Sequence, residues 1–402
     1  MTQLAYRAPA PSRAATGLPR GLSTGLFAGF SDDLPDDLST GIPGFGPAHA
    51  DSAAGLADRP IGAKPRLTTT VPKEYVHRAC HAEVFLTGSE QSSDTTFTVT
   101  AQWPRAHTFF STPDGTGHDP MQAAETIRQT GLYLAHTRFG VPLDHRFMMW
   151  NLDCTTHPRR LTIGGTPTDL TIEARLEPQP RTRTTIDFTL TITMRRGPHV
   201  AATGLTRFTT VSDATYRRLR GACRNPDTNR ADGTNGTDHT DGPGGPDGPD
   251  GPDGPDGPDG TSTSERLVPA QAPAGPPLPP ARVGRLRPAD VVLTPSDEPD
   301  TWHLTPDPWH PILFDHAIDH IPGMVLLEAA RQAANALTSP VTIAPTTMTT
   351  TYHRYAEHDA PTTVTACLTR AEDPDALTTV VTGHQYGAPI FTTVITGRPE
   401  HG

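Results

Sequence analysis

The chain contains the same motif twice, and this repeat restricts it to folds that can be built by duplication. Shifting the sequence by 203 positions superimposes a histidine and an E-x-x-R-Q motif of the first half on those of the second. The paired residues are His107 with His310, Glu125 with Glu328, Arg128 with Arg331 and Gln129 with Gln332. Upstream, AEVFLT resembles ADVVLT, with a four-residue difference in length. The chain therefore holds two copies of one domain.

The second motif lies in an apolar stretch that follows Pro322. Glu328, Arg331, Gln332 and Asn335 are three, four and seven residues apart, so they form one polar stripe on a helix that is otherwise apolar. Such a helix is buried nearly all round, and charged groups in a core cost several kcal/mol unless they are paired. Either Glu328 and Arg331 neutralise each other as a structural pair, or they serve a ligand.

The approach to this helix favours a ligand site. Pro322-Gly323 opens the first turn, where glycine lets a ligand approach the exposed amides at the positive end of the helix. His310, His316 and His320 come just before it. This arrangement can polarise a carbonyl.

The first copy lacks the Pro-Gly step and both later histidines. There, Asp119-Pro120 supplies an N-cap and a first helical residue, the helix runs from Met121 to His136, and Gly140 ends it. The two potential sites are therefore unequal.

Alternating apolar residues predict strands on either side of each helix. In the first copy they begin at Phe97, Leu170 and Thr185; in the second they lie near Val291 and at 346–355, 362–368, 378–383 and 389–395. One helix inside a strongly bent antiparallel sheet is the hot-dog arrangement. We expect an α+β protein of two tandem hot-dog domains that form an intrachain pseudo-dimer, with further association left open.

The composition predicts where these domains begin and end. We expect a disordered leader over residues 1–71, a first domain over 72–221, a disordered Gly/Pro/Asp linker over 222–279 and a second domain over 280–402. The basic cluster of Arg217, Arg218 and Arg220 after the last strand of the first copy is expected to form a solvated face.

Charge and cysteine content exclude several classes of protein. The 402 residues carry a net charge of -11, which argues against nucleic acid as a partner. The sequence has neither a signal peptide nor a run of about 20 apolar residues, so we expect a soluble, cytoplasmic protein with no membrane partner. Its four cysteines have no metal-ligand spacing, so we expect free thiols and neither a metal nor a cofactor. These residues are Cys80, Cys154, Cys223 and Cys367.

Several motifs together resemble the A-factor biosynthesis (AfsA-type) family. They are FDHAIDHIPGMVLLEAARQA in the second copy and VHRACHAEVFLT, AQWPRAHTFF and HDPMQAAETIRQ in the first. The resemblance covers residues 72–215 and 280–398. It implies two hot-dog domains and an acyltransferase that moves a β-ketoacyl chain from acyl carrier protein to the hydroxyl of dihydroxyacetone phosphate. The ester can then condense to a butenolide phosphate, a precursor of γ-butyrolactone, butenolide or furan signals.

A more distant resemblance links P-G-x(4)-E at Gly323 to Glu328 with hydroxyacyl-carrier-protein dehydratases, whose glutamate and preceding histidine do acid/base work. His316 matches that histidine only if two residues are deleted. As hypotheses, we assign the oxyanion-binding amides to Gly323 and Met324, and the base to Glu328 with its pKa raised by burial.

The remaining candidates surround this centre. Arg331 is expected to bind the substrate phosphate, Gln332 to contact substrate, and His316 to act as an auxiliary acid or orienting group, with a structural hydrogen bond as its alternative. Glu125 and Arg128 form a second active site, a specificity site or a fold-preserving pair, and we favour the last two because the first copy lacks the glycine turn. His107 and His310 are expected to tie the sheet to the helix.

Two rival functions use the same features. A hot-dog hydratase, dehydratase or thioesterase would bind an acyl thioester at the same helix but would not need an arginine beside the glutamate. A non-catalytic protein that binds an acyl ligand would retain its ligand without turnover.

Overall fold

The computed structural model describes residues 68–182, 185–224, 275–371 and 373–399. Most of the expected leader and linker lies outside these ranges, as does the side chain of Cys223. No helix among the described residues is both long enough and apolar enough to cross a membrane.

The first copy forms six strands and a long helix, followed by a shorter one. The elements are β1 (Leu86–Gln91), β2 (Thr96–Trp103), α1 (Pro120–Phe139), β3 (Arg146–Thr156), β4 (Thr168–Thr182), β5 (Thr185–Arg196), β6 (His199–Val211) and α2 (Asp213–Arg224).

The second copy repeats the six strands and the long helix. Its elements are β7 (Leu293–Pro295), β8 (Thr301–Leu304), α3 (Gly323–Thr338), β9 (Ile343–Tyr352), β10 (Thr363–Thr369), β11 (Leu377–Gln385) and β12 (Ala388–Pro399).

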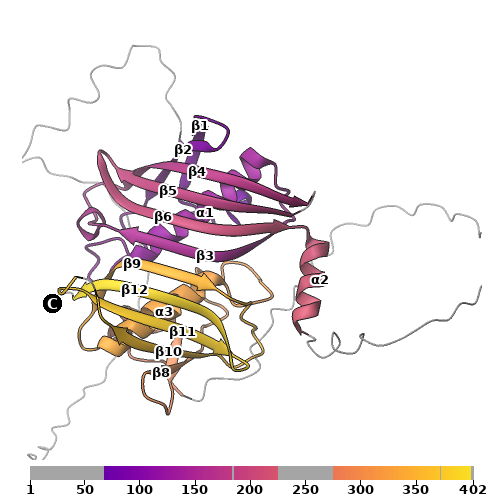
Figure 1. Cartoon of the computed structure of the whole chain (residues 1–402). Helices are drawn as coiled ribbons and strands as arrows, with labels where there is room; N and C mark the ends of the chain where they lie inside the picture. Colours follow the sequence, from indigo (N-terminus) through magenta and orange to yellow (C-terminus); the bar gives the residue numbers. More distant parts are fainter. Residues whose placement is uncertain (1–67, 183–184, 225–274, 372, 400–402) are drawn as a thin grey trace, which may run out of the picture. The chain divides into compact units, whose positions relative to one another are not determined.

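The strands make one antiparallel sheet in the order β1-β2-β4-β5-β6-β3-β9-β12-β11-β10-β8-β7 (Figure 1). Read outward from the centre, the order in one copy matches the order in the other, so the copies are related by a pseudo-twofold axis. The joint is the β3–β9 pair, in which Asp153 lies opposite Thr349. Helix α1 packs on the first half of the sheet and α3 on the second (Figure 1). The predicted pair of hot-dog domains is confirmed.

Local chemistry explains the two long helices. The Asp119 carboxylate accepts a hydrogen bond from the Met121 amide at 2.8 Å, Pro120 opens α1, and Gly140 ends it with a φ of 65°. Helix α3 begins one residue later than the Pro-Gly step suggests, because Pro322 is its N-cap and Gly323 its first helical residue. Its side chains from Met324 to Ala336 are all buried, as the sequence predicts.

Strand β3 was not predicted, although it forms the joint between the copies. Its apolar residues Phe147, Met148, Met149 and Trp150 are consecutive, so they give no alternating pattern. Phe147 to Trp150 line a cavity beside the sheet, which explains why successive residues are apolar.

The expected solvated face after β6 needs a correction. Arg217 and Arg218 on α2 are exposed, but Arg220 is only 5% exposed. Its guanidinium pairs with Glu357 and Asp319 of the second copy and lies 4.6 Å from the centre of the Tyr355 ring. The acidic partners are about 100 or more positions away, so the local sequence does not reveal them.

Candidate active site

Each E-x-x-R-Q motif builds a buried ion cluster, and the two clusters have the same layout. Both glutamates are fully buried, and each carboxylate accepts hydrogen bonds from two arginines and a glutamine. For Glu125 the donors are Arg78 (3.0 Å), Arg128 (2.9 Å) and Gln129 (2.8 Å); for Glu328 they are Arg285 (2.7 Å), Arg331 (2.9 Å) and Gln332 (2.6 Å).

The charge state of both glutamates contradicts the expected base. Burial alone would raise the pKa of Glu328, but the Arg285 and Arg331 guanidiniums outweigh burial and lower it to about 2. Arg128 and Arg78 lower the pKa of Glu125 to about 2 in the same way. The predicted rise in the pKa of Glu328 is therefore wrong, because the prediction counted burial and omitted Arg285. An anion held by two guanidiniums is a poor proton acceptor.

Arg78 and Arg285, which the sequence analysis missed, also join the two copies. Arg78 donates to the Ile312 carbonyl at 2.9 Å, and Arg285 donates to the Phe109 carbonyl at 2.6 Å. The signal in the sequence is the pair V-H-R and V-G-R, which lies just before the AEVFLT and ADVVLT segments.

Gln332 has its hydrogen-bonding groups occupied by protein. Its amide donates to the Asp290 carbonyl at 2.7 Å and accepts from the Val292 amide at 2.9 Å. Gln129 binds the Glu83 carbonyl and the Phe85 amide in the same manner. These contacts suit a role in holding the fold better than a role in contacting substrate.

A cavity of about 1190 Å³ lies between the copies. Five of the predicted site residues line it, and three do not. The lining residues are Glu125, Arg128, His316, Gly323 and Met324, whereas Glu328, Arg331 and Gln332 are absent from its wall. The cavity thus combines the first copy's motif with the start of the second copy's helix.

His107 and His310, which occupy equivalent positions in the two copies, do not line the cavity. The Nδ1 atom of His310 accepts from the Ile312 and Leu313 amides, while Nε2 lies 3.0 Å from the Asp290 carboxylate. His107 accepts from the amides of Phe109 and Phe110. Each histidine therefore fixes the loop in front of its helix.

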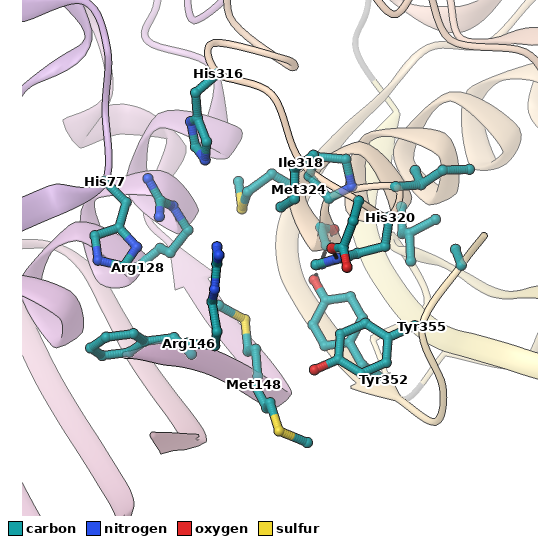
Figure 2. A pocket seen from close by; sticks show the side chains of 18 of the residues that line it. His77, Arg128, Arg146, Met148, His316, Ile318, His320, Met324, Tyr352 and Tyr355 are labelled. Atoms are coloured by element: carbon teal, nitrogen blue, oxygen red, sulfur yellow. Dashed lines mark hydrogen bonds and ion pairs between the residues drawn. The ribbon is translucent and has the colours of Figure 1, made fainter. Parts of the chain in front are cut away.

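One end of the cavity is cationic. His77, Arg128, Arg146 and His316 point toward the same space (Figure 2). Arg128 is anchored by Glu125, yet among the described residues no protein partner is recorded for its Nη1 atom. Asp315 accepts hydrogen bonds from the Ala79 and Cys80 amides, which holds the loop of His316 against the segment of His77.

His77 is kept neutral by this environment. Burial, followed by the charges of Arg128, His136, His316 and Arg146, lowers its pKa to about 3. The His136 Nδ1 atom lies 2.7 Å from the Val141 carbonyl, which can only accept, so Nδ1 of His136 carries the proton. The His136 Nε2 atom then accepts from Nε2 of His77 at 2.9 Å. The Nδ1 atom of His77 is left with a lone pair.

His77 also has a left-handed backbone conformation, with a φ of 51°. Its counterpart in the second copy is Gly284, with a φ of 64°. Glycine adopts this conformation freely, whereas other residues do so at a cost on the order of 1 kcal/mol. The first copy therefore tolerates strain in order to place an imidazole at the cavity.

The other end of the cavity is the beginning of α3. Among the described residues, no protein acceptor is recorded for the Gly323 and Met324 amides, and both residues line the cavity. The Tyr352 hydroxyl donates to the Gly323 carbonyl at 3.0 Å, and a Cβ atom on Gly323 would lie 3.3 Å from the Tyr352 ring. A larger residue would therefore press against the tyrosine where it closes over the helix start, and the free amides can polarise a carbonyl.

The solved structures to which the chain is similar include thioesterases. The 12:0-ACP thioesterase from Umbellularia californica is 10% identical with a TM-score of 0.40, and the match covers 77% of this chain and all of that one. An acyl-CoA thioesterase II from Mycobacterium marinum is 10% identical with a TM-score of 0.34, covering 82% and 98%.

Similarity to curated sequences is higher. A 2-oxo-3-(phosphooxy)propyl 3-oxoalkanoate synthase from Streptomyces virginiae is 38% identical over 333 residues, 83% of this chain and 99% of the relative. Proteins of the same name from Streptomyces coelicolor and Streptomyces griseus are 36% and 33% identical, and the matches cover 93% and 96% of those relatives. The model of the A-factor biosynthesis hotdog domain matches residues 62–212 and 269–400, one match on each copy. The chain belongs to the A-factor biosynthesis hotdog (AfsA) family.

Proposed function

We propose that the chain transfers a β-ketoacyl group from acyl carrier protein to the hydroxyl of dihydroxyacetone phosphate, the step that forms the skeleton of a γ-butyrolactone-type signal. The relatives' name describes an ester of this kind, in which a 3-oxo acid is joined to a phosphorylated three-carbon ketone. The observation that carries the proposal is one cavity with a cationic end and a free helix start.

The cationic end suits the phosphate of the acceptor. Arg128 is held by Glu125 and lines the cavity. Arg146, whose Nε atom pairs with Asp213 at 3.2 Å, adds a second guanidinium from β3, and His316 adds an imidazole. Guanidinium groups bind phosphate through short, charge-assisted hydrogen bonds. We therefore assign to Arg128 the phosphate-binding role first assigned to Arg331, which is 4% exposed and does not line the cavity.

The start of α3 suits the thioester. The amides of Gly323 and Met324 face the cavity side of the helix, where they stabilise negative charge on the carbonyl oxygen as the hydroxyl attacks. Donors placed in this way typically lower the barrier by a few kcal/mol. The C–O bond of the new ester forms, the C–S bond breaks, and the carrier protein leaves as its thiol.

The test is a mass-spectrometric transfer assay with β-ketoacyl carrier protein and dihydroxyacetone phosphate. The wild type is expected to give a phosphorylated ester or its butenolide. Arg128→Gln removes the phosphate contact and is expected to raise the KM for dihydroxyacetone phosphate by at least about tenfold. Arg175→Gln is the matched control, because Arg175 is an exposed arginine that pairs with Glu177 and does not line the cavity.

Each rival function predicts a different product. Free acid alone would indicate a thioesterase, an enoyl product a dehydratase, and ligand retention without turnover a binding protein. Any of these outcomes with the wild type would contradict the transferase.

A further inference from the structure

A pair of adjacent residues, Asp319 and His320, lies on the cavity wall just before α3, outside every role assigned above. The His320 Nδ1 atom is 2.8 Å from the Asp319 carboxylate. Figure 2 places His320 beside Met324 and Tyr352, across the cavity from Arg128. The pair is therefore close to the helix start that would hold the thioester.

Helix α2 of the first copy fixes this pair from outside. The Tyr216 hydroxyl donates to the Asp319 carboxylate at 2.8 Å and lies 3.3 Å from Nδ1 of His320. Arg220 donates to the Asp319 carbonyl at 3.1 Å and pairs with its carboxylate at 3.4 Å. Arg220, which also pairs with Glu357, thus ties the Asp319–His320 pair to α2 across the boundary between the copies.

The contacts determine the tautomer of His320. Burial works to raise the pKa of Asp319, but hydrogen bonds from His320 and Tyr216 and the charges of His320 and Arg220 outweigh burial and hold that pKa below its usual value. An ionised carboxylate accepts only, so Nδ1 of His320 carries the proton and Nε2 carries the lone pair. Among the described residues, no protein partner is recorded for Nε2.

His316 has a weaker version of the same arrangement. Its Nδ1 atom is 3.7 Å from Asp315, whose carboxylate already accepts from two backbone amides. Its side chain is 47% exposed, against 19% for His320. Of the two histidines, His320 is therefore the more firmly oriented. The first copy has no equivalent of His320, because Gly117 occupies the corresponding position of the repeat.

We propose that His320 is the general base of the transfer, oriented by Asp319 and by Tyr216 of α2; this inference rests on the proposed acyltransferase function. Its Nε2 atom takes the proton from the acceptor hydroxyl while that oxygen forms the C–O bond with the thioester carbon. When the C–S bond breaks, Nε2 returns the proton to the carrier thiolate. Atoms and charge balance without a further reactant.

The first experiment separates binding from chemistry in the full chain. His320→Gln is expected to lower kcat by on the order of 10²-fold or more, while the KM for dihydroxyacetone phosphate changes less than about threefold. His316→Gln, at the cationic end, is expected to raise that KM with little effect on kcat. His199→Gln is the matched control, because His199 is exposed and lies outside the cavity wall.

The second experiment tests the orientation of the histidine. Asp319→Asn removes the carboxylate that favours protonated His320, so the acid limb of the kcat profile is expected to move to lower pH. The other titratable groups around the ring are Tyr216 and Arg220 from α2, and Tyr355, Glu357 and His358 from the segment after β9. The substitution takes a partner from Tyr216 and Arg220, but the pKa of each is raised and lies far above the acid limb. A purely structural role would leave the limb in place.

The outcomes test the role of His320 separately from the proposed acyltransferase function. If the wild type forms no phosphorylated ester, both the acyltransferase function and the role of His320 as its base are wrong. If the wild type forms the ester and His320→Gln keeps kcat within about threefold, only the role of His320 as general base is wrong. If His320→Gln fails to fold, an unmoved acid limb in Asp319→Asn overturns the base by itself.

Discussion

Replacing Glu328 with glutamine tests whether the second motif serves the fold or the chemistry. The Glu328 carboxylate is fully buried and binds Arg285 and Arg331, whose side chains are 3% and 5% exposed. Glutamine has nearly the same shape but no charge, so both guanidiniums lose the Glu328 carboxylate, and Arg285 keeps its pair with Asp119 at 3.3 Å. Removing one partner from a buried ion cluster typically costs about 3–5 kcal/mol.

The pKa of Glu328 gives a second estimate of this cost. Its fall from 4.5 to about 2 corresponds to about 3 kcal/mol of stability at neutral pH. Because the folded-state pKa is the lower one, this stability is present above pH 4.5 and is lost as the pH falls toward 2. About 2 kcal/mol of the difference between wild type and Glu328→Gln should disappear between pH 7 and pH 3.

Urea unfolding followed by circular dichroism measures both quantities. Glu177→Gln, in an exposed ion pair with Arg175, is the control and should change stability by less than about 0.5 kcal/mol. Where Glu328→Gln is still folded, its transfer rate should stay within about threefold of wild type, because Glu328 does not line the cavity. A variant as stable as wild type that has lost transfer would refute this reasoning and restore Glu328 as a catalytic group.

Two further predictions follow from other pKa shifts. Burial, and then the charges of nearby basic groups, hold the pKa of His77 at about 3. A bound phosphate dianion offsets those charges and should raise this pKa, so binding of dihydroxyacetone phosphate at pH 6 should be accompanied by proton uptake on His77. Titration calorimetry in two buffers measures the uptake, and His77→Asn should abolish it. Cys154, buried with its pKa raised to about 12, should resist a thiol reagent that labels the exposed Cys80 and Cys367, and labelling of Cys154 in the folded protein would contradict its burial.

Much of the fold could be predicted because the repeat and the local chemistry agree. Helix α1 begins at an Asp-Pro cap and ends at Gly140, and both signals depend only on neighbouring residues. Strand β4 buries every second residue from Thr168 to Leu176, so periodicity finds it. Strand β3 was missed because four consecutive apolar residues, Phe147 to Trp150, line the cavity, so the strand shows no alternation.

The site was harder to predict because its parts come from distant segments. Gly323 and Met324 follow from helix geometry, and the cavity includes them. Helix geometry does not show which of the two motifs lines the cavity, because both contain the same residue types and both glutamates are buried. Arg285 covers Glu328 and packs 3.9 Å from the centre of the Phe109 ring, a contact between the copies that neither motif encodes. His77 could have been found by comparing V-H-R with V-G-R, because only one copy has a side chain where the other has glycine.

The most direct test of the account is a crystal structure of the chain with dihydroxyacetone phosphate and no acyl donor. The account predicts one molecule per chain, with its phosphate bound by Arg128 and its hydroxyl directed toward His320 and the start of α3. Phosphate bound instead at Arg331, or one molecule at each motif, would contradict the central claim that a single cavity between the copies performs the transfer.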